Sequence, residues 1–237
     1  MKINNPGEEE FIKGTLYIVS TPIGNLEDIT LRALRILKEV DLIAAEDTRH
    51  TRKLLSHYRI HTPLLSYFTH NKIRRERQFL KQLEEGQSVA LVSEAGTPGI
   101  SDPGYSLIRA VLEAGMDIVS IPGPTALISA LSLSGLPTHE FIFVGFLSSK
   151  SGRRRKELQN LKAETRTIVF YESPHRLVAT LRDILEILGD RHTVIARELT
   201  KKYEEICRGK VSRQLTKFTA ARPRGEFVIV VEGEQTS

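Results

Sequence analysis

Short apolar runs alternate with helical periodicity in the first half of the chain. Runs of aliphatic and β-branched residues, typical of buried strands, occupy residues 15–20, 41–46, 88–93 and 117–121. Between them, apolar residues recur every three or four positions, which predicts helices over residues 31–40, 74–85 and 104–115. For the last helix we predict Asp102 as the N-cap and Pro103 as the first helical position.

The pattern starts afresh after the sequence PGPT at residues 122–125. It predicts helices over 125–135, 150–164 and 173–189, and strands over 141–146, 167–172, 193–200 and 226–233. Because short buried strands alternate with helices, we expect βαβ units and mostly parallel sheet. The sequence therefore predicts an α/β protein with a mobile tail over 1–13 and two α/β domains over 14–123 and 124–237.

Composition limits the classes of protein that this chain can represent. Of its 237 residues 40% are hydrophobic and 27% charged, which is typical of a globular protein. No apolar run reaches the roughly 20 residues of a membrane helix, and acids near the start argue against a signal peptide. We therefore expect a cytoplasmic protein without membrane contact. The single cysteine, Cys207, and seven scattered histidines favour neither a disulfide framework nor a metal site.

The chain carries a moderate excess of positive charge. Lys and Arg number 34 against 29 Asp and Glu, and the pI is near 9.3. The excess is concentrated in KIRRER at residues 72–77 and KSGRRRK at residues 150–156. Such clusters permit a polyanionic partner, although a solvated helix face explains each of them equally well.

Four turns rich in Gly, Pro or polar residues directly follow predicted strands. They occupy residues 20–28, 93–104, 122–126 and 171–176. On one open sheet such turns lie along one edge, where they can form one cleft. Glycine lets the backbone approach a ligand and proline removes a donor, while the Lys-Ser/Thr ending of a triphosphate loop is absent from these turns. Together they predict a site for a nucleoside with an uncharged or zwitterionic tail, although any single turn is more simply a tight connection.

Long stretches of the chain resemble one family of methyltransferases. The stretches are VSTPIGNLEDITLRALRILKEVDLIAAEDTRHTRKLL, VSEAGTPGISDPG, IPGPTALISALSLSGLP and FYESPHRL. They are similar to the tetrapyrrole methylase superfamily, whose members use S-adenosylmethionine without a Rossmann glycine fingerprint. TPIGNLEDIT with AEDTRHT is similar to the branch that methylates the ribose 2′-hydroxyl of a cytidine in the decoding region of 16S rRNA. The resemblance implies a homodimer that acts on the small ribosomal subunit, with the methyl donor bound between two α/β domains.

The resemblance also implies which residues border the donor. They lie in three of the turns and comprise Thr21, Pro22, Ile23, Gly24 and Asn25, then Glu94, Gly96, Thr97, Pro98 and Ile100, then Pro122, Gly123, Pro124, Thr125 and Ala126. Thr97 stands where many relatives carry aspartate, so no role of that aspartate is transferred to this chain.

Methyl transfer to a ribose hydroxyl also needs a base, because a neutral hydroxyl is a poor nucleophile. The candidates are Glu46, Asp47, Glu94, Glu172, His175 and Lys201, of which we place Lys201 and Glu94 first. A lysine acts as a base only if burial or neighbouring cations lower its pKa. Structural roles compete with each assignment: Glu46 or Asp47 can pair with Arg49 or Arg52, Glu172 with Arg176, and Lys201 with Glu198 in an ion network that includes Arg197.

If the acceptor is RNA, the two basic clusters are candidate phosphate contacts. They contain Arg74, Arg75, Arg77, Arg153, Arg154 and Arg155, with Tyr67, Phe68 and Phe146 nearby for stacking on a base. Two alternatives stay open. One is a methyltransferase of the same fold that acts on a corrinoid or a diphthamide precursor, and the other is a non-catalytic RNA-binding α/β module.

Overall fold

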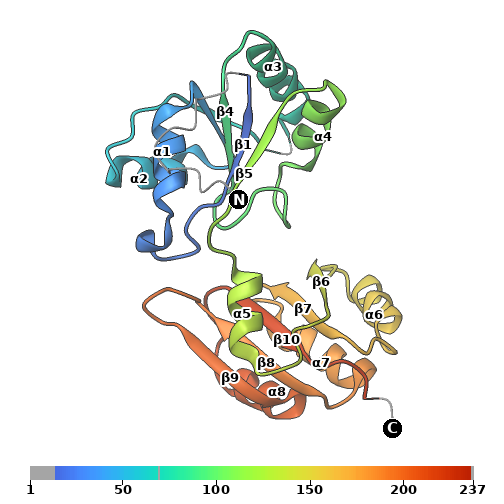
Figure 1. The fold of residues 1–237 in the computed structure, drawn as a ribbon. Coiled ribbons are helices and arrows are strands. Elements are labelled where there is room, and N and C mark those ends of the chain that lie inside the picture. Colours follow the sequence, from blue (N-terminus) through green and yellow to red (C-terminus); the bar gives the residue numbers. More distant parts are fainter. Residues whose placement is uncertain (1–13, 69, 236–237) are drawn as a thin grey trace, which may run out of the picture. The chain divides into compact units, whose positions relative to one another are not determined.

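The computed structural model of the protein describes residues 14–68 and 70–235, so the tail predicted over 1–13 lies outside the described residues. Two compact units make up the chain (Figure 1). The first contains the chain before Ile23 together with Leu26–Pro124, and the second contains Ile23–Asn25 and the chain from Thr125 onward. The second unit thus includes three residues of the first predicted turn. The predicted domains, 14–123 and 124–237, were continuous in sequence and placed these residues in the first domain.

The described part of the first unit forms a five-stranded parallel sheet in the order β3-β2-β4-β1-β5. Its strands are β1 (Leu16–Val19), β2 (Leu42–Ala45), β3 (Leu64–Ser66), β4 (Val89–Val92) and β5 (Ile118–Ile121). Its helices are η1 (Leu26–Asp28), α1 (Leu31–Glu39), α2 (Thr48–His57), α3 (Lys72–Glu84) and α4 (Tyr105–Glu113). Apolar residues of α1 and α2 pack on one face of the sheet and those of α3 and α4 on the other. A parallel sheet covered on both faces explains the near-continuous apolar strands.

Local sequence accounts for most of these elements. Thr30 caps α1, where its side chain accepts a hydrogen bond of 3.1 Å from the amide of Ala33. Neither α2 nor β3 is predicted by the apolar periodicity of the sequence. Asp47 caps α2 by accepting from the amides of Arg49 and His50, and that short polar helix buries only one narrow stripe around Leu54 and Leu55.

The described part of the second unit forms a mixed five-stranded sheet in the order β6-β7-β10-β8-β9. Its strands are β6 (Phe141–Phe146), β7 (Thr167–Glu172), β8 (His192–Arg197), β9 (Glu205–Lys210) and β10 (Phe227–Val231). Its helices are α5 (Ala126–Ser134), α6 (Ser151–Asn160), α7 (Leu177–Leu188) and α8 (Val211–Ala220). Only β6 and β7 pair in parallel here, so the expectation of mostly parallel sheet is wrong for this unit.

The antiparallel character arises because β8 and β9 form a hairpin and β10 inserts between β7 and β8. Neither β9 nor α8 was predicted from periodicity. One face of this sheet packs against apolar residues of α6, α7 and α8, and the other packs against α5 and Ile23. The inserted segment from the first turn is therefore part of the core of the second unit.

Two predicted helix starts are also wrong. Helix α4 begins at Tyr105 after Gly104 and has no side-chain cap, so Asp102 is not its N-cap. Helix α7 begins at Leu177, after a turn that contains Ser173 and Pro174. Throughout residues 14–68 and 70–235, no helix has both the length and the apolar character needed to cross a membrane.

Candidate functional site

Three of the predicted turns meet at the carboxyl edge of the parallel sheet. They follow β1, β4 and β5, and β1 lies between the other two strands. The backbones of Thr21 and Gly96 exchange two hydrogen bonds of 2.9 Å each. The hydroxyl oxygens of Ser20 and Thr97 lie 2.8 Å apart. Residues more than 70 positions apart in sequence thus form one continuous rim, as the order of the strands requires.

The turn after β4 has an unusual backbone that explains its glycines. Gly96, Gly99, Ser101 and Gly104 all have positive φ, at 78°, 83°, 64° and 149°. A Cβ atom on Gly104 would lie 3.0 Å from the amide nitrogen of Gly99. The turn therefore folds back on itself, and this closure needs a residue without a side chain.

The turn after β5 approaches the turn after β1 equally closely. A Cβ atom on Gly123 would lie 2.9 Å from the Cβ atom of Ser20, a separation that real side chains do not adopt. The amide of Ser20 in turn donates to the carbonyl of Ile121 over 3.2 Å. Backbone, rather than side chains, forms most of this rim, which is what a flat uncharged ligand needs for close approach.

The structure does not place all predicted donor residues in one unit. Gly24, Thr125 and Ala126 belong to the second unit, and the turn at residues 171–176 follows β7 of the second sheet. A Cβ atom on Gly24 would lie 2.4 Å from the Cγ atom of Lys201. The idea that all four turns share the edge of one sheet is wrong, because the strands that precede them belong to two sheets.

A group of carboxylates lies on the same rim of the first unit. It consists of Glu46 after β2, Glu94 after β4 and Asp102 in the folded-back turn. Burial, together with the negative charges of Asp102 and Glu94, raises the pKa of Glu46 to about 6. Burial also raises the pKa of Asp102 to about 6. A hydrogen bond from Ser93 opposes this rise, and the negative charge of Glu94 adds to it.

The other acidic candidates and His175 have different surroundings. Asp47 caps α2 and lies 3.6 Å from the Arg49 guanidinium, so it is one of the predicted structural pairs. Glu172 is 2% exposed, accepts a 2.6 Å hydrogen bond from the Thr180 hydroxyl and forms an ion pair with Arg176. These contacts hold two acids in structural roles, whereas His175 is exposed on the turn after β7.

Lys201 lacks the environment that a basic amine needs. Its ammonium group lies 2.9 Å from carboxylate oxygens of both Glu198 and Glu226. Burial disfavours the charged form, but the two hydrogen-bonded carboxylates outweigh it and raise the pKa of Lys201. The condition for a lysine base was a lowered pKa, so this structure contradicts Lys201 as the general base.

The two basic clusters differ in exposure. Arg74 and Arg77 are exposed on α3, whereas Arg75 is half-buried and donates to Gln78. In the second cluster Arg153 is exposed, but the neighbouring Arg154 is 5% exposed.

Arg154 binds Asp183 through its Nη2 and Nε atoms, at 2.6 and 2.7 Å, and Arg155 pairs with both Asp183 and Glu186. Arg154 is thus an internal link between α6 and α7, and the prediction that it contacts phosphate is wrong. Half-buried Arg155 is committed to the same network. From the sequence alone, Arg154 and Arg155 could not be distinguished from exposed Arg153.

The aromatic candidates are also unlike one another. Tyr67 is only 1% exposed, and its hydroxyl group donates to Glu76 over 2.8 Å, so it is not available for stacking. Phe68 and Phe146 are 38% and 55% exposed. The ring of Phe146 contacts the edge of Tyr171 in the second unit. Of the three aromatic residues, Phe68 and Phe146 therefore keep faces that a base can reach.

The rim fits a nucleoside ligand better than a metal or a polyphosphate. Its inner groups are backbone amides and carbonyls with the hydroxyls of Ser20, Thr21 and Thr97. Within the described chain, no group of three or more His, Cys, Asp and Glu side chains is arranged to hold a metal ion. Neutral donors and acceptors beside carboxylates suit a cationic or zwitterionic ligand.

Comparison with known proteins agrees with this reading of the fold. Residues 15–214 match the family described as Tetrapyrrole (Corrin/Porphyrin) Methylases. A solved structure of uroporphyrin-III C-methyltransferase from Thermus thermophilus, complexed with S-adenosyl homocysteine, has a TM-score of 0.64. It is 20% identical in sequence, and the alignment covers 91% of this chain and 96% of that one. The chain belongs to the tetrapyrrole methylase family.

Curated relatives narrow the assignment within that family. A protein of Synechocystis sp. is 54% identical over 93% of this chain and 79% of its own length. A protein of Thermotoga maritima is 54% identical over 94% of this chain and 100% of its own length. Both are named Ribosomal RNA small subunit methyltransferase I, and at this identity and coverage the chain belongs to that branch of the family.

Proposed function

We propose that this protein transfers a methyl group from S-adenosylmethionine to the ribose 2′-hydroxyl of a cytidine in the decoding region of 16S rRNA. One observation carries the proposal: a chain about half identical to small-subunit rRNA methyltransferases has the glycine-rich rim at the carboxyl edge of its parallel sheet. We further propose that it acts as a cytoplasmic homodimer on the small ribosomal subunit.

The rim residues bind and orient the donor. When bound, S-adenosylmethionine supplies both the methyl group and a sulfonium leaving group. The paired backbones of Thr21 and Gly96 fix the shape of the rim, Thr97 contributes its hydroxyl group, and Gly123 leaves the space that a side chain would fill. Correct alignment of two reactants can lower a barrier by about 7–11 kcal/mol, so positioning is the main task of these residues.

The carboxylates of the rim take the proton from the ribose hydroxyl. A general base works best when its pKa lies near the working pH, and burial places the pKa of Glu46 at about 6. At pH 7 to 8 Glu46 is therefore ionised and able to accept a proton. We assign the role first to Glu46, with exposed Glu94 as the alternative, in place of Lys201.

Exposed arginines of both units bind the RNA backbone. Arg74, Arg77 and Arg153 are exposed, and in the described chain none of them forms an ion pair with a carboxylate. Each arginine that neutralises one phosphate of single-stranded RNA adds about 0.7 to the salt dependence of binding. Arg154 and Arg155 are excluded from this set by their contacts with Asp183.

A transfer assay tests the proposal. The purified protein is incubated with S-adenosylmethionine carrying a tritiated methyl group and with small subunits from a strain that lacks the ribose methyl. We expect one methyl on one cytidine ribose, located by mass spectrometry of the digested 16S rRNA. Transfer to a corrinoid but not to rRNA, or calorimetry that detects RNA binding without donor binding, would refute the proposal.

A further inference from the structure

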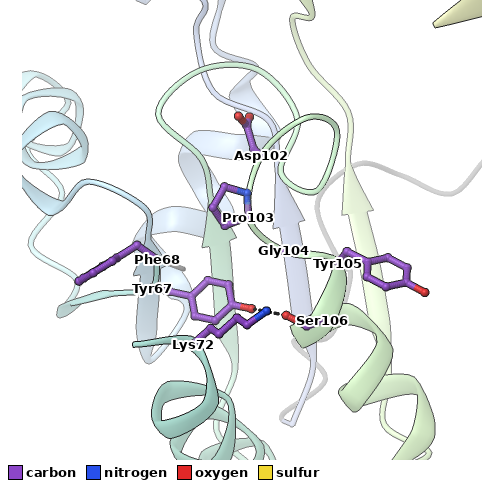
Figure 2. Close-up of a pocket in the computed structure, with 8 residues that line it drawn as sticks. All are labelled: Tyr67, Phe68, Lys72, Asp102, Pro103, Gly104, Tyr105 and Ser106. Carbon is purple, nitrogen blue, oxygen red and sulfur yellow. Dashed lines mark hydrogen bonds between the residues drawn. The ribbon is translucent and has the colours of Figure 1, made fainter. Parts of the chain in front are cut away.

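A recess lies in the first unit beside the rim, with which it shares Asp102. It has a volume of about 220 Å³ and is lined by Tyr67, Phe68, Lys72, Asp102, Pro103, Gly104, Tyr105 and Ser106. Figure 2 shows these residues, which come from the segment after β3, the start of α3 and the segment that leads into α4. The turn at residues 93–104 thus has its first half on the rim and its second half in the wall of this pocket.

The floor of the pocket is a closed set of hydrogen bonds. The Tyr67 hydroxyl and the Ser106 hydroxyl both donate to one carboxylate oxygen of Glu76, over 2.8 and 2.6 Å, and their two oxygens lie 3.2 Å apart. The contact between Tyr67 and Ser106 is the dashed line in Figure 2. Both bonds end on the Oε1 atom of Glu76, so one carboxylate holds the two hydroxyl groups in place.

Lys72 brings an uncommitted positive charge to the pocket. Over the described chain, no carboxylate lies within 4.0 Å of its ammonium group, unlike Lys81 of the same helix, which pairs with Glu85. Exposed Arg74 and Arg77 follow on α3 and extend the positive charge along the helix. A cation without a partner in a concave site favours an anionic group of a ligand.

The side chain of Asn71 holds the backbone of Phe68, one of the residues that line the pocket. The Asn71 amide oxygen accepts a 2.9 Å hydrogen bond from the Phe68 amide, and its nitrogen donates to the Ser66 carbonyl over 3.1 Å. Phe68 nevertheless stays 38% exposed. An exposed aromatic ring offers a face on which a base can stack.

We propose that this pocket binds one nucleotide of the acceptor RNA, with its phosphate at Lys72 and its base against Phe68. This inference rests on the proposed function and names the substrate contact beside the donor rim. The volume is below the roughly 300–1,000 Å³ of pockets for drug-sized ligands and suits a single base. Stacking on an aromatic ring with a lysine at the phosphate is a common way to hold single-stranded RNA.

The position of Asp102 gives the nucleotide a direction. Figure 2 shows Asp102 and Lys72 at opposite ends of the lining, with Pro103 between them. A phosphate next to Asp102 would be repelled, whereas at Lys72 it meets an opposite charge. The phosphate is therefore placed at Lys72, away from Asp102, and Asp102 itself lies close enough to Glu94 for the charge of Glu94 to raise its pKa. The nucleotide would thus be held beside the carboxylates of the rim.

Four variants test the pocket against matched controls. Phe68→Leu keeps an apolar side chain and removes the ring, Lys72→Ala removes the charge, and Lys72→Arg retains it. Lys81→Ala makes the same change of charge on the same helix outside the pocket. Binding of a fluorescent single-stranded fragment of the 16S decoding region is measured by anisotropy at several salt concentrations, and donor binding by calorimetry.

We expect Phe68→Leu to weaken RNA binding by about 5- to 150-fold, the effect of losing one stacked base. Lys72→Ala should lower the slope of log affinity against log salt by about 0.7, whereas Lys72→Arg should preserve it. Lys81→Ala should leave the slope unchanged, and all four variants should bind the donor as the wild type does.

Two results would overturn the pocket assignment. One is RNA binding by Phe68→Leu equal to that of the wild type, and the other is an equal effect of Lys72→Ala and Lys81→Ala. An effect on binding of assembled subunits but not of the naked fragment would indicate a ribosomal protein at this pocket, and would also overturn it. Absence of methyl transfer by the wild-type protein instead refutes the proposed function, so the two failures are distinguishable.

Discussion

The ion pair between Arg154 and Asp183 provides a sharp test of how the basic cluster at residues 150–156 is divided between structure and RNA binding. Both side chains are less than a tenth exposed, and they are joined at 2.6 Å. Removing one partner of a buried pair destabilises a protein by about 3–5 kcal/mol when the other charge is left without compensation. Here Asp183 keeps half-buried Arg155 as a partner at 2.9 Å, which compensates part of its charge. We therefore expect Arg154→Ala to lower the free energy of unfolding by at most about 3–5 kcal/mol and the Tm by at most about 6–20 °C.

Adjacent Arg153 supplies the matched control. It is exposed, so Arg153→Ala should change the free energy of unfolding by no more than about 0.5 kcal/mol while weakening RNA binding. The paired apolar replacement of Arg154→Met with Asp183→Leu should recover most of the loss, because no unpaired charge between these two positions stays buried.

Urea unfolding, monitored by circular dichroism, gives the free energies of unfolding, and calorimetry gives the Tm. The reasoning is refuted if Arg153→Ala and Arg154→Ala have the same stability. It is also refuted if Arg154→Ala keeps full stability and loses RNA affinity, because Arg154 would then be a phosphate contact after all.

Three further changes probe the donor rim. Gly123→Ala places a methyl group 2.9 Å from Ser20, and we expect calorimetry to show donor binding weakened at least about fivefold, whereas Gly152→Ala, with open space around it, leaves donor binding unchanged. Glu46→Gln should lower kcat by about 10²- to 10⁴-fold if Glu46 is the base, and an unchanged kcat would exclude it. Because folding raises the pKa of Glu46 from 4.5 to about 6, the stability of the wild type falls as pH rises through that interval. Glu46→Gln should then be more stable than the wild type by about 1 kcal/mol at pH 8 in urea titrations, a difference that should vanish below pH 4.5. Lys201→Met should leave the pH dependence of kcat unchanged, because two carboxylates keep Lys201 protonated. If the variant instead loses the acid limb of the pH profile, Lys201 is the general base.

Much of the fold could be predicted from the sequence, because burial on one face of a helix or on both faces of a strand imposes a period on the residues. Strands β1, β2 and β4 are buried apolar runs, and α1 has a regular apolar stripe. Elements such as α2 and β3 escaped prediction for the opposite reason. They are short or polar, and contacts with the rest of the unit stabilise them more than their own pattern does.

The donor rim was also within reach of the sequence, since turns rich in Gly and Pro after parallel strands must lie at one edge of a sheet. The turns that contain Thr21, Gly96 and Gly123 were placed together on that basis, and these three residues, which the family resemblance implied, do lie together. The fourth turn was misplaced because a one-dimensional pattern does not indicate which of two sheets a strand joins. The second sheet is mixed, and nothing in the local sequence of β10 specifies that it inserts between β7 and β8.

The sequence by itself determined most of the strand and helix pattern, the backbone character of the rim and the family. Only the tertiary structure decided which charges are free. Arg153 and Arg154 are identical in type and adjacent in the chain, yet one faces solvent and the other Asp183, 29 positions away. Lys72, Lys201 and Glu46 are likewise distinguished only by the carboxylates and the burial that folding brings to them. The energy of a charge depends on its surroundings, and those surroundings come from residues that are distant in sequence.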